Sequence, residues 1–590
     1  MTTVEHYLRL YLAFEKELGK KHEVTLSAVS DILFCTARNS KMTIQKWENE
    51  GWVHWSPGRG RGNKSTLTFL KEPGDLLFNE SKVLVQKGKL KAAQEKISSY
   101  SGELPGLKEK FEVWLETLFG YNTESENNQH RDVLRMKYGK QPFTPLDPML
   151  ASLRSECHIL KHVCDTLVSY NEEKNLFEPR LSFHWEHNEE GDQWTFYIRK
   201  GVKFHDGKRL TAEDIQFTFI RFLSFEKNPY RWMLEDLEEA VIVNEQSIML
   251  KLKRPNFLLL HILSDEHLSI VSKDEQKEFY AETLIGTGPF KLVRNDGSML
   301  IMEANDHYFR ERPFLDAVEF WNVPEEREDR TPGKTEVEFG YSRDRSGEGK
   351  KRKRDKRVEK NVQFLSLNAK NEVMRDPFLR QALKAIADPS VLVGELGEFR
   401  QETADGFLNR PSDSGTADIK NLLKKSKYNG EELRLYTFQD RDHLEDADWL
   451  KQRALKFGVI LKNIFLPAEE LLKEETMEEA DIIHDSATIT EQEELSFLQL
   501  IFAKANPVWH HLPGELKDSI MTEVNHLKGI SNPQERMKRL YSIEEMLLNS
   551  CQVLPLYKNM SEMESDESIQ QALINSQGWI DFYRIWFKRK

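Results

Sequence analysis

The side chains with the clearest chemical potential lie near the N-terminus, where basic and amide groups recur at helical spacing. Residues 37–50 have the pattern of a helix with Ile44 and Trp47 on one face, which leaves polar side chains on the outer face. Arg, Lys, Asn and Gln hydrogen-bond to phosphates and to base edges in the major groove of DNA. More basic residues follow in a glycine-rich stretch, where they would lie along phosphates. We therefore predict eight residues that contact double-stranded DNA: Thr36, Arg38, Asn39, Lys41, Gln45, Arg59, Arg61 and Lys64.

Two other interpretations of this region are open. Helix pairs with basic surfaces are common, so helical spacing alone does not establish DNA binding. The run Gly62-Asn63-Lys64-Ser65 also resembles part of a phosphate-binding P-loop. A P-loop requires Lys directly after Gly and a helix after it, whereas here Asn63 intervenes and strand-like residues follow. We therefore reject nucleotide binding by this loop.

Residues suited to catalysis or to metal binding do not occur in a recognisable pattern. The pairs His510-His511 and His184 with His187 come closest to metal-ligand spacing, but no Cys, Asp or Glu accompanies them at that spacing. We expect ordinary surface histidines there, with no metal and no cofactor. The sequence has no Gly-x-Ser-x-Gly and no His-Glu-x-x-His motif. We predict that the protein is not an enzyme.

The elements that would position the N-terminal side chains have the order of a helix-turn-helix followed by a wing. A first helix is expected over residues 5–18, and a second helix opens at Thr25 as its N-cap. A break at Cys35-Thr36 separates it from the helix of residues 37–50. Residues 52–55 and 66–69 are strand-like and would form a β-hairpin around the glycine-rich tip.

Composition places the chain among soluble, cytoplasmic proteins. Its 590 residues exceed what one core supports and indicate several domains. No run of eighteen apolar residues exists, and charged residues interrupt the apolar stretch at the N-terminus, which argues against a signal peptide. The four cysteines form no C-x-x-C pair, as is typical of a reducing compartment. Residues 1–70 carry a net charge of +3 and the remainder −16, which suits a basic part that meets an anion.

The stretch from Trp194 to Phe222 has the pattern of a strand, a turn and a helix. Trp194, Phe196 and Ile198 alternate with polar residues, and Thr211 stands three residues before Asp214 as in a capping box. This string closely resembles the signature of the extracytoplasmic solute-binding proteins of family 5. Further segments match the same family: Leu146-Asp147-Pro148, Gly286-Thr287-Gly288-Pro289, Phe364–Asn368, Ala480–Ile483 and Val553–Tyr557. The resemblance implies two α/β lobes joined by a hinge, with a ligand enclosed between them.

The N-terminal region is similar to the winged-helix domain of SgrR-type transcriptional regulators. The similarity covers the run from Thr25 to Thr36, the Glu50-Gly51-Trp52 junction and the glycine-rich tip with the strand after it. That family joins this domain to a family 5 module in the same order. We therefore expect a multidomain α/β protein, with a winged helix-turn-helix at 1–70, a helical connector at 71–131 and a two-lobed, periplasmic-binding-protein-like module at 132–590. Residues 121–129 and the basic run 350–357 are expected to be loops.

The ligand would contact loops at strand ends in the cleft that the resemblance implies. We predict eight residues for this role: Arg154, Glu156, His158, Gly286, Thr287, His484, Asp485 and Trp509. An Arg at the first of these positions would hold a carboxylate or a phosphate bidentately, and the Trp would stack on a sugar or base. Ion pairing within the protein and core packing are the alternatives. The acidic residue with which peptide binders of the family hold an α-amino group is not identifiable.

These features favour a bacterial transcription regulator that binds promoter DNA and senses a small metabolite such as a sugar, a sugar phosphate or a peptide. The alternative is the substrate-binding component of an ABC peptide transporter, which requires export and membrane tethering. Ligand identity, operator, sign of regulation and oligomeric state stay open.

Overall fold

The protein divides into two compact units, the first comprising Met1–Phe119 and the second beginning at Gly120. The computed structural model describes residues 3–14, 16–58, 64–126, 129–138, 146–172, 174–274, 284–323, 352–397, 400–408, 418–504, 506–566, 569–572 and 579–588. Both units mix helices and strands, which confirms the predicted multidomain α/β class. None of the helices in these ranges is long and apolar enough to cross a membrane.

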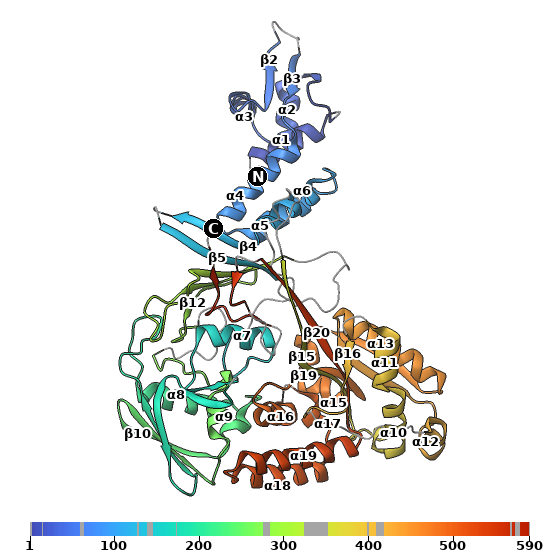
Figure 1. Ribbon diagram of the computed structural model, residues 1–590. Helices are drawn as coiled ribbons and strands as arrows, with labels where there is room; N and C mark the ends of the chain where they lie inside the picture. The colour runs from blue at the N-terminus through green and yellow to red at the C-terminus, as the bar shows by residue number, and fades with distance from the viewer. Residues whose placement is uncertain are drawn as a thin grey trace. The chain divides into compact units, whose positions relative to one another are not determined.

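The first unit begins with a winged helix-turn-helix (Figure 1). Its elements are α1 Thr3–Leu12, β1 Lys21–Val24, α2 Leu26–Leu33, α3 Ala37–Asn49, β2 Val53–Ser56 and β3 Ser65–Phe69. The strands form an antiparallel sheet in the order β1-β3-β2, with Lys21 opposite Thr68 and Val53 opposite Phe69. The predicted helices and wing strands are confirmed, although the first helix ends at Leu12 and β1 was not predicted.

Tyr7 is the centre of the core in this winged helix. Its ring is fully buried and meets Trp47 of α3 and Phe69 of β3 edge-on, at centroid distances of 5.5 and 5.6 Å. The phenol donates a hydrogen bond to the carbonyl of Lys71 at 2.7 Å, so the polar end of the buried ring is satisfied. These contacts fix α3 against the sheet.

Three further helices belong to the same unit: α4 Pro73–Gln86, α5 Leu90–Tyr100 and α6 Leu107–Glu116. Lys96 of α5 forms ion pairs with Glu80 of α4 at 3.0 Å and with Glu5 of α1 at 3.3 Å. The helices expected as a connector therefore pack on the winged helix.

The second unit begins with β4, which the sequence prediction missed. Residues 121–129 were expected to be a loop, but β4 Gly120–Glu126 pairs with β5 Gln129–Tyr138, with Tyr121 opposite Leu134. β4 is the edge strand of a sheet in the order β12-β13-β14-β5-β4. An edge strand tolerates a polar sequence, so the apolar alternation that marks a buried strand is absent.

The first lobe of the second unit contains two larger sheets, besides the two-stranded pairs β6-β7 and β21-β22. One is the β4-containing sheet, and the other has the order β10-β11-β9-β8. Its remaining elements are α7 Arg154–Val163, β6 Val168–Asn171, β7 Leu176–Pro179, β8 Ser182–His187, β9 Gln193–Ile198, α8 Ala212–Ser224, η1 Arg231–Leu234, β10 Leu237–Asn244, β11 Ser247–Leu252, α9 Leu259–Leu263, η2 Glu266–Leu268, β12 Phe290–Asn295, β13 Met299–Ala304, β14 Ala317–Asn322, β21 Ile569–Gln570 and β22 Trp586–Phe587.

The predicted strand, turn and helix of residues 194–222 are confirmed as β9 and α8. Trp194, Phe196 and Ile198 are buried on one face of β9. Both the amide and the hydroxyl of Thr211 donate to the Asp214 carboxylate, at 2.8 and 2.9 Å, which caps α8.

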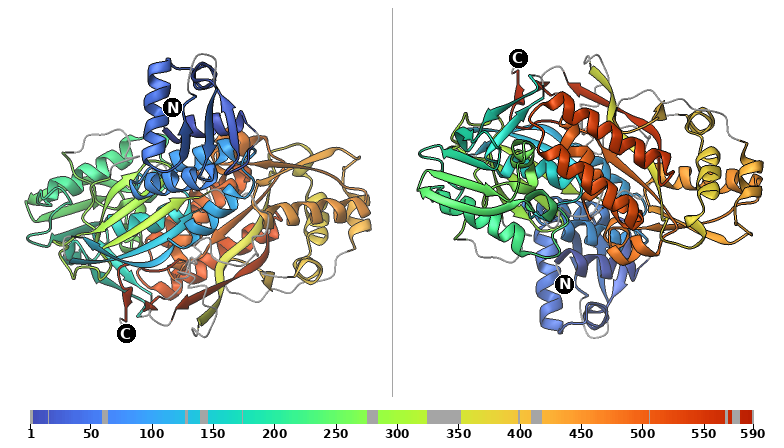
Figure 2. Two further views of the ribbon diagram at one scale, coloured as in Figure 1. Left: turned by 90° about the horizontal axis from the view of Figure 1, so that it is seen from above. Right: turned by 90° about the horizontal axis from the view of Figure 1, so that it is seen from below.

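The second lobe is built on one sheet in the order β16-β20-β15-β19-β17-β18. Its elements are β15 Arg352–Leu367, η3 Val373–Arg375, α10 Pro377–Ile386, α11 Pro389–Leu396, β16 Arg400–Thr403, α12 Ile419–Lys425, β17 Glu432–Phe438, α13 Arg441–Lys456, β18 Ile460–Leu466, α14 Ala468–Leu471, α15 Glu474–Glu479, β19 Ile482–Thr488, α16 Glu493–Phe502, α17 Pro507–His511, α18 Gly514–Lys528, α19 Pro533–Asn549 and β20 Val553–Asp566. Seen from below in Figure 2, α18 and α19 lie side by side in red.

The basic run expected to be a solvated loop is instead strand from Arg352 onward, while residues 350 and 351 lie outside the described ranges. β15 pairs antiparallel with β20, and the register sets Arg352 opposite Asp566 and Arg354 opposite Glu564. The run therefore forms a strand by pairing with a segment far away in the chain, which the sequence around it does not reveal.

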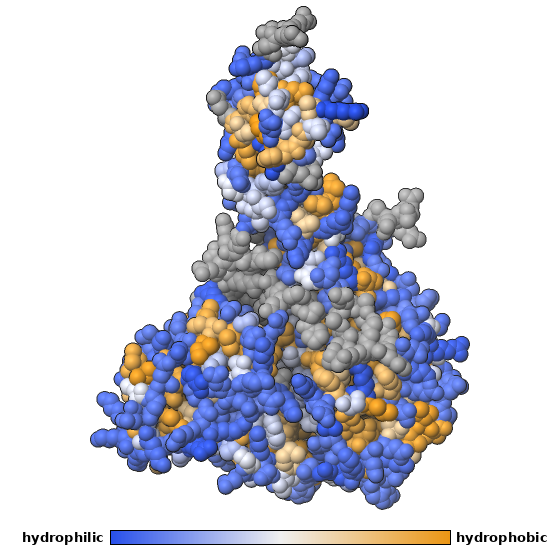
Figure 3. All heavy atoms as spheres, turned by 180° about the vertical axis from the view of Figure 1, so that it is seen from behind, coloured by the Kyte–Doolittle hydropathy of each residue, from blue (hydrophilic) through white to orange (hydrophobic). Residues whose placement is uncertain are grey.

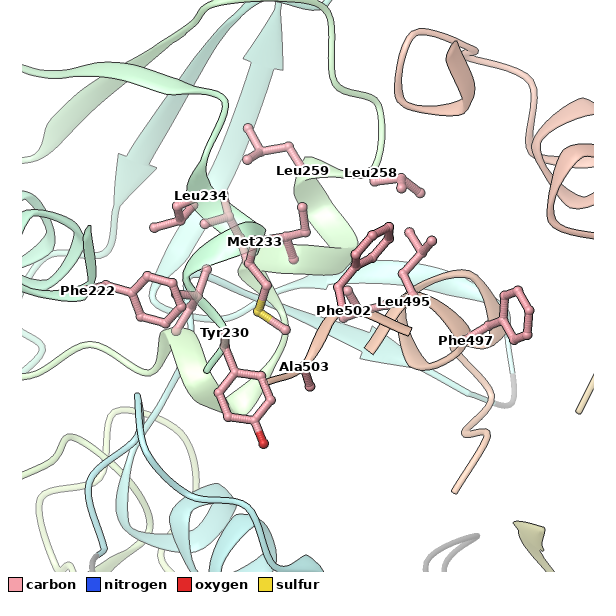
Figure 4. Close-up of a cluster of buried hydrophobic side chains, with 14 of the residues drawn as sticks. Phe222, Tyr230, Met233, Leu234, Leu258, Leu259, Leu495, Phe497, Phe502 and Ala503 are labelled. Carbon is pink, nitrogen blue, oxygen red and sulfur yellow. The ribbon is translucent and has the colours of Figure 1, made fainter. Parts of the chain in front are cut away.

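The two lobes meet through a hydrophobic cluster. Leu258 and Leu259 of the first lobe and Leu495 and Phe502 of α16 belong to one buried set, shown in Figure 4. This shared cluster packs α16 against α9.

Candidate functional site

Helix α3 presents the predicted DNA-contacting side chains to solvent. Arg38, Asn39, Lys41 and Gln45 are all exposed, whereas Ser40, Ile44 and Trp47 of the same helix are buried. No described residue forms an ion pair with Arg38 or Lys41, so both cations are available to an external anion. Thr36 caps the helix by accepting a hydrogen bond from the Asn39 amide at 3.4 Å.

Small polar contacts hold α2 and α3 together. The hydroxyls of Ser30 and Ser40 lie 2.8 Å apart, and the Cys35 sulfur is 3.1 Å from Ser40 Oγ. Ser40 is fully buried, so these bonds are shielded from water. These buried contacts therefore hold α2 and α3 in a fixed orientation relative to each other.

The wing is described on both sides of its tip. Arg59 and Arg61 lie outside the described residues. Lys64 is exposed and forms an ion pair with Glu23 of β1 at 3.5 Å. Both side chains are more than half exposed, and such a pair contributes little to stability, so Lys64 can exchange Glu23 for a phosphate.

Three of the predicted ligand contacts lie on α7. Arg154 is the first residue of the helix and is half-buried. The Glu156 carboxylate accepts hydrogen bonds from the amides of Ser152 and Leu153, at 3.0 and 3.1 Å. Burial raises the pKa of Glu156 to about 7, although these bonds act in the opposite direction. His158 is buried and stacks on Trp579 with a centroid distance of 4.9 Å.

Gly286 and Thr287 pack against the C-terminal end of α7. A β-carbon at Gly286 would lie 2.0 Å from the carbonyl oxygen of Val163, so only glycine is accommodated. The Thr287 hydroxyl donates to the buried Asp165 carboxylate at 3.1 Å, which also receives hydrogen bonds from Arg180 and Tyr308. This turn therefore builds the first lobe.

The other three predicted contacts lie in the second lobe. His484 and Asp485 are on β19 and are buried. Burial lowers the pKa of His484 well below its usual value and raises the pKa of Asp485 to about 6. Trp509 on α17 is half-buried, with Lys517 Nζ 4.7 Å from its ring centroid. The predicted ligand residues thus divide between the lobes, and their ligand role stays a prediction.

Polar contacts also cross between the lobes. His261 of α9 hydrogen-bonds to the Gln492 side chain at 3.0 Å, and Gln499 of α16 donates to Asp265 at 2.8 Å. The Lys528 ammonium is almost fully buried and pairs with Asp236 at 2.7 Å. These contacts were not predicted, because partners more than 200 positions apart leave no local signal in the sequence.

The expectation of surface histidines at positions 510 and 511 is wrong. Both side chains are buried, because α17 packs between β15 and α15. The His511 ring is hydrogen-bonded to the Ser366 hydroxyl and to the Met477 carbonyl. Glu474, Glu478 and His510 place potential metal-binding atoms within 4.8 Å of one another. Lys370 already forms an ion pair with Glu478 at 3.0 Å, so the carboxylates are partly neutralised and we assign no metal.

Two family descriptions match this arrangement. Residues 2–114 match "Sugar transport-related sRNA regulator N-term", and residues 177–507 match "Bacterial extracellular solute-binding proteins, family 5 Middle". The matches follow the division of the structure, the first covering the winged helix with its three helices and the second most of the two lobes.

Similar proteins include full-length relatives. The chain is 35% identical over 592 residues to the Bacillus subtilis protein "Uncharacterized protein YhjP", covering all of both chains. It is 25% identical to "HTH-type transcriptional regulator SgrR" of Yersinia enterocolitica, covering 99% of this chain and 98% of that one. Among solved structures, the periplasmic binding protein DppA from Helicobacter pylori, bound to the peptide STSA, gives a TM-score of 0.64 at 19% identity, covering 78% of this chain and 98% of that chain.

Proposed function

The chain belongs to the SgrR-like family of transcriptional regulators, which joins an SgrR N-terminal region to a family 5 solute-binding module, and we propose that it regulates transcription by coupling ligand binding to DNA binding. SgrR regulators and solute-binding proteins are non-enzymatic, so binding is the activity to explain. DNA binding is assigned to α3 and the wing. Sensing is assigned to the cleft between the two lobes.

The main support for this proposal is the exposed polar face of α3, whose opposite face is packed in the core of the winged helix. Arg38, Lys41 and Gln45 are exposed in a row, and buried residues of the same helix fix its orientation. A helix of this kind enters the major groove, where Arg reads guanine and Gln or Asn reads adenine. The name of the SgrR relatives supports this assignment.

The sensing mechanism proposed is a population shift. The contacts of Asp236, Asp265 and Gln492 with the other lobe stabilise the closed state. A ligand changes the equilibrium only through a difference in its affinity for the open and closed states. We propose that lobe closure changes the availability of α3 for DNA. The ligand class stays open among sugars, sugar phosphates and peptides; the solved relative that carries a peptide shares the fold only.

Two measurements on the full chain test this function. Selection from a random duplex pool should enrich a defined sequence. A thermal-shift screen of sugars, sugar phosphates and short peptides should give a ligand that raises the unfolding temperature, because binding to the folded state stabilises it by mass action. The same ligand should change the affinity for the enriched duplex.

The alternative is a binding component of a peptide importer, which the fold alone would also allow. It predicts a stabilising peptide ligand but no enriched duplex. A chain that binds peptides and shows no preference among DNA sequences would therefore replace our proposal with this alternative.

A further inference from the structure

Phe34 is the most exposed large hydrophobic side chain in the described part of the chain. Its exposed fraction is 81%, against 64% for Phe314 and 63% for Met42. Single hydrophobic residues are common on protein surfaces, and Figure 3 shows several separate hydrophobic patches. Exposure alone therefore does not indicate a binding role for Phe34. Its backbone conformation distinguishes it from the other exposed hydrophobic residues.

Phe34 adopts the left-handed conformation, with φ of 52° and ψ of 44°, at the end of α2. This conformation suits Gly and Asn, because a β-carbon crowds the following carbonyl. The remaining non-glycine residues described with positive φ are Lys16, Asn175, Cys551 and Gln571. Phe34 is the one aromatic residue among them. Its ring is in solvent, so burial of the ring does not offset this strain.

Arg9 of α1 holds the exposed ring. Its guanidinium carbon lies 4.9 Å from the ring centroid of Phe34, a cation–π geometry. No described residue forms an ion pair with Arg9. The pair therefore offers an apolar ring and an available positive charge side by side.

The pair lies next to the proposed recognition helix. Phe34 is in the turn that joins α2 to α3, and α3 begins three residues later at Ala37. Arg38 and Lys41 are exposed on the first two turns of that helix. An apolar ring beside several cations matches the surface of a DNA strand, where sugars and bases alternate with phosphates.

We propose that Phe34 and Arg9 contact DNA together, with the ring packed on a sugar or base and the guanidinium facing the adjacent phosphate. This inference rests on the proposed function and extends the DNA-contacting surface to α1 and to the turn. It also explains the strain, because local strain persists where it serves a function.

The test compares Phe34→Asn with Phe314→Asn in the full chain, since Phe314 is an exposed aromatic residue in the other unit. The probe is the duplex most enriched by the wild-type protein from a random pool. Phe34→Asn should weaken binding by about tenfold and leave the salt dependence unchanged, because the lost contact is apolar.

Arg9→Ala should weaken binding and lower the salt slope by about 0.9, because one phosphate contact is lost. Phe314→Asn should bind as the wild type does.

Hydrogen exchange separates contact from folding. In Phe34→Asn, the amides of α2 and α3 should exchange no faster than in the wild type, because Asn suits the left-handed conformation. Unchanged affinity in this variant would overturn the proposal. Faster exchange together with weaker binding would also overturn it, since Phe34 would then support the fold. A wild-type protein that enriches no duplex would instead overturn the proposed function itself.

Discussion

His205 and Gly288 are joined by a hydrogen bond in which the imidazole Nε2–H donates to the glycine carbonyl at 3.0 Å. Nδ1 of the same ring accepts from the Gly286 amide at 3.3 Å. The neutral imidazole, with its proton on Nε2, therefore links the turn before α8 to the glycine turn before β12. Two segments that the sequence marked separately as family signatures are thus one structural feature.

The His205 link makes stability depend on pH. Burial lowers the pKa of His205 to about 4, whereas the unfolded value is about 6.5. Above pH 6.5 both states are neutral, and between pH 6.5 and 4 only the unfolded state binds the proton. The free energy of unfolding should therefore fall over that window by up to about 3 kcal/mol. In His205→Gln, denaturant titrations at several pH values should show a shallower fall, and an unchanged slope would contradict this role.

Alanine at Gly286 should destabilise the first lobe. The new β-carbon would meet the Val163 carbonyl at 2.0 Å, a backbone atom that cannot move aside without disturbing α7. We expect a loss of about 3 kcal/mol or more in chemical denaturation. Gly394→Ala is the matched control, because nothing lies within 4 Å of its β-carbon and α11 favours Ala by about 1 kcal/mol. If the two variants were equally stable, the close approach of Gly286 to the Val163 carbonyl would be contradicted.

Replacing Lys96 should loosen the winged helix from its neighbouring helices. The ammonium pairs with Glu5 of α1 and Glu80 of α4, and its side chain is 12% exposed. Lys96→Met leaves two partly buried carboxylates without their cation, at an expected cost of about 1–3 kcal/mol. Adding Glu80→Gln should recover part of this loss. A purely additive double mutant would show that the three charges do not interact.

Replacing Asp485 should stabilise the second lobe at alkaline pH. Burial raises the pKa of Asp485 to about 6, above the unfolded value of about 3.9, so the folded state binds a proton first as the pH falls. Above pH 6 the buried charge opposes folding. Asp485→Asn should therefore be more stable than the wild type at pH 8, by up to about 3 kcal/mol, and the difference should shrink toward pH 4. A stability difference that does not change with pH would argue against this effect.

Local signals in the sequence predicted the winged helix and the unit around β9. The Thr25 cap, the burial of Trp47 and the box of Thr211 with Asp214 each depend on residues within one or two turns. Such features can be recognised before the fold is known, because the interacting residues lie close together in the chain.

Features that depend on distant partners could not be predicted. The polar strand β4 forms because β5 lies beside it, and the histidines of α17 are buried because β15 and α15 cover them. Arg400 of β16 forms a buried pair with Asp446 of α13 at 2.7 Å, and nothing near either residue indicates the other. The candidate ligand residues also depend on distant partners, because they come from both lobes and neither lobe alone indicates which side chains lie together.

The most direct test of the account is the salt dependence of DNA binding by the full chain with Arg38, Lys41 and Gln45 replaced by Ala. The control is Lys87→Ala with Lys89→Ala, because both lysines are exposed at the turn between α4 and α5. On the enriched duplex, the triple variant should bind at least about 100-fold more weakly, with a salt slope lower by about 2, because two cations are lost. The control should retain the wild-type affinity and slope. A triple variant that binds as tightly as the wild type, with the same slope, would contradict DNA recognition by α3.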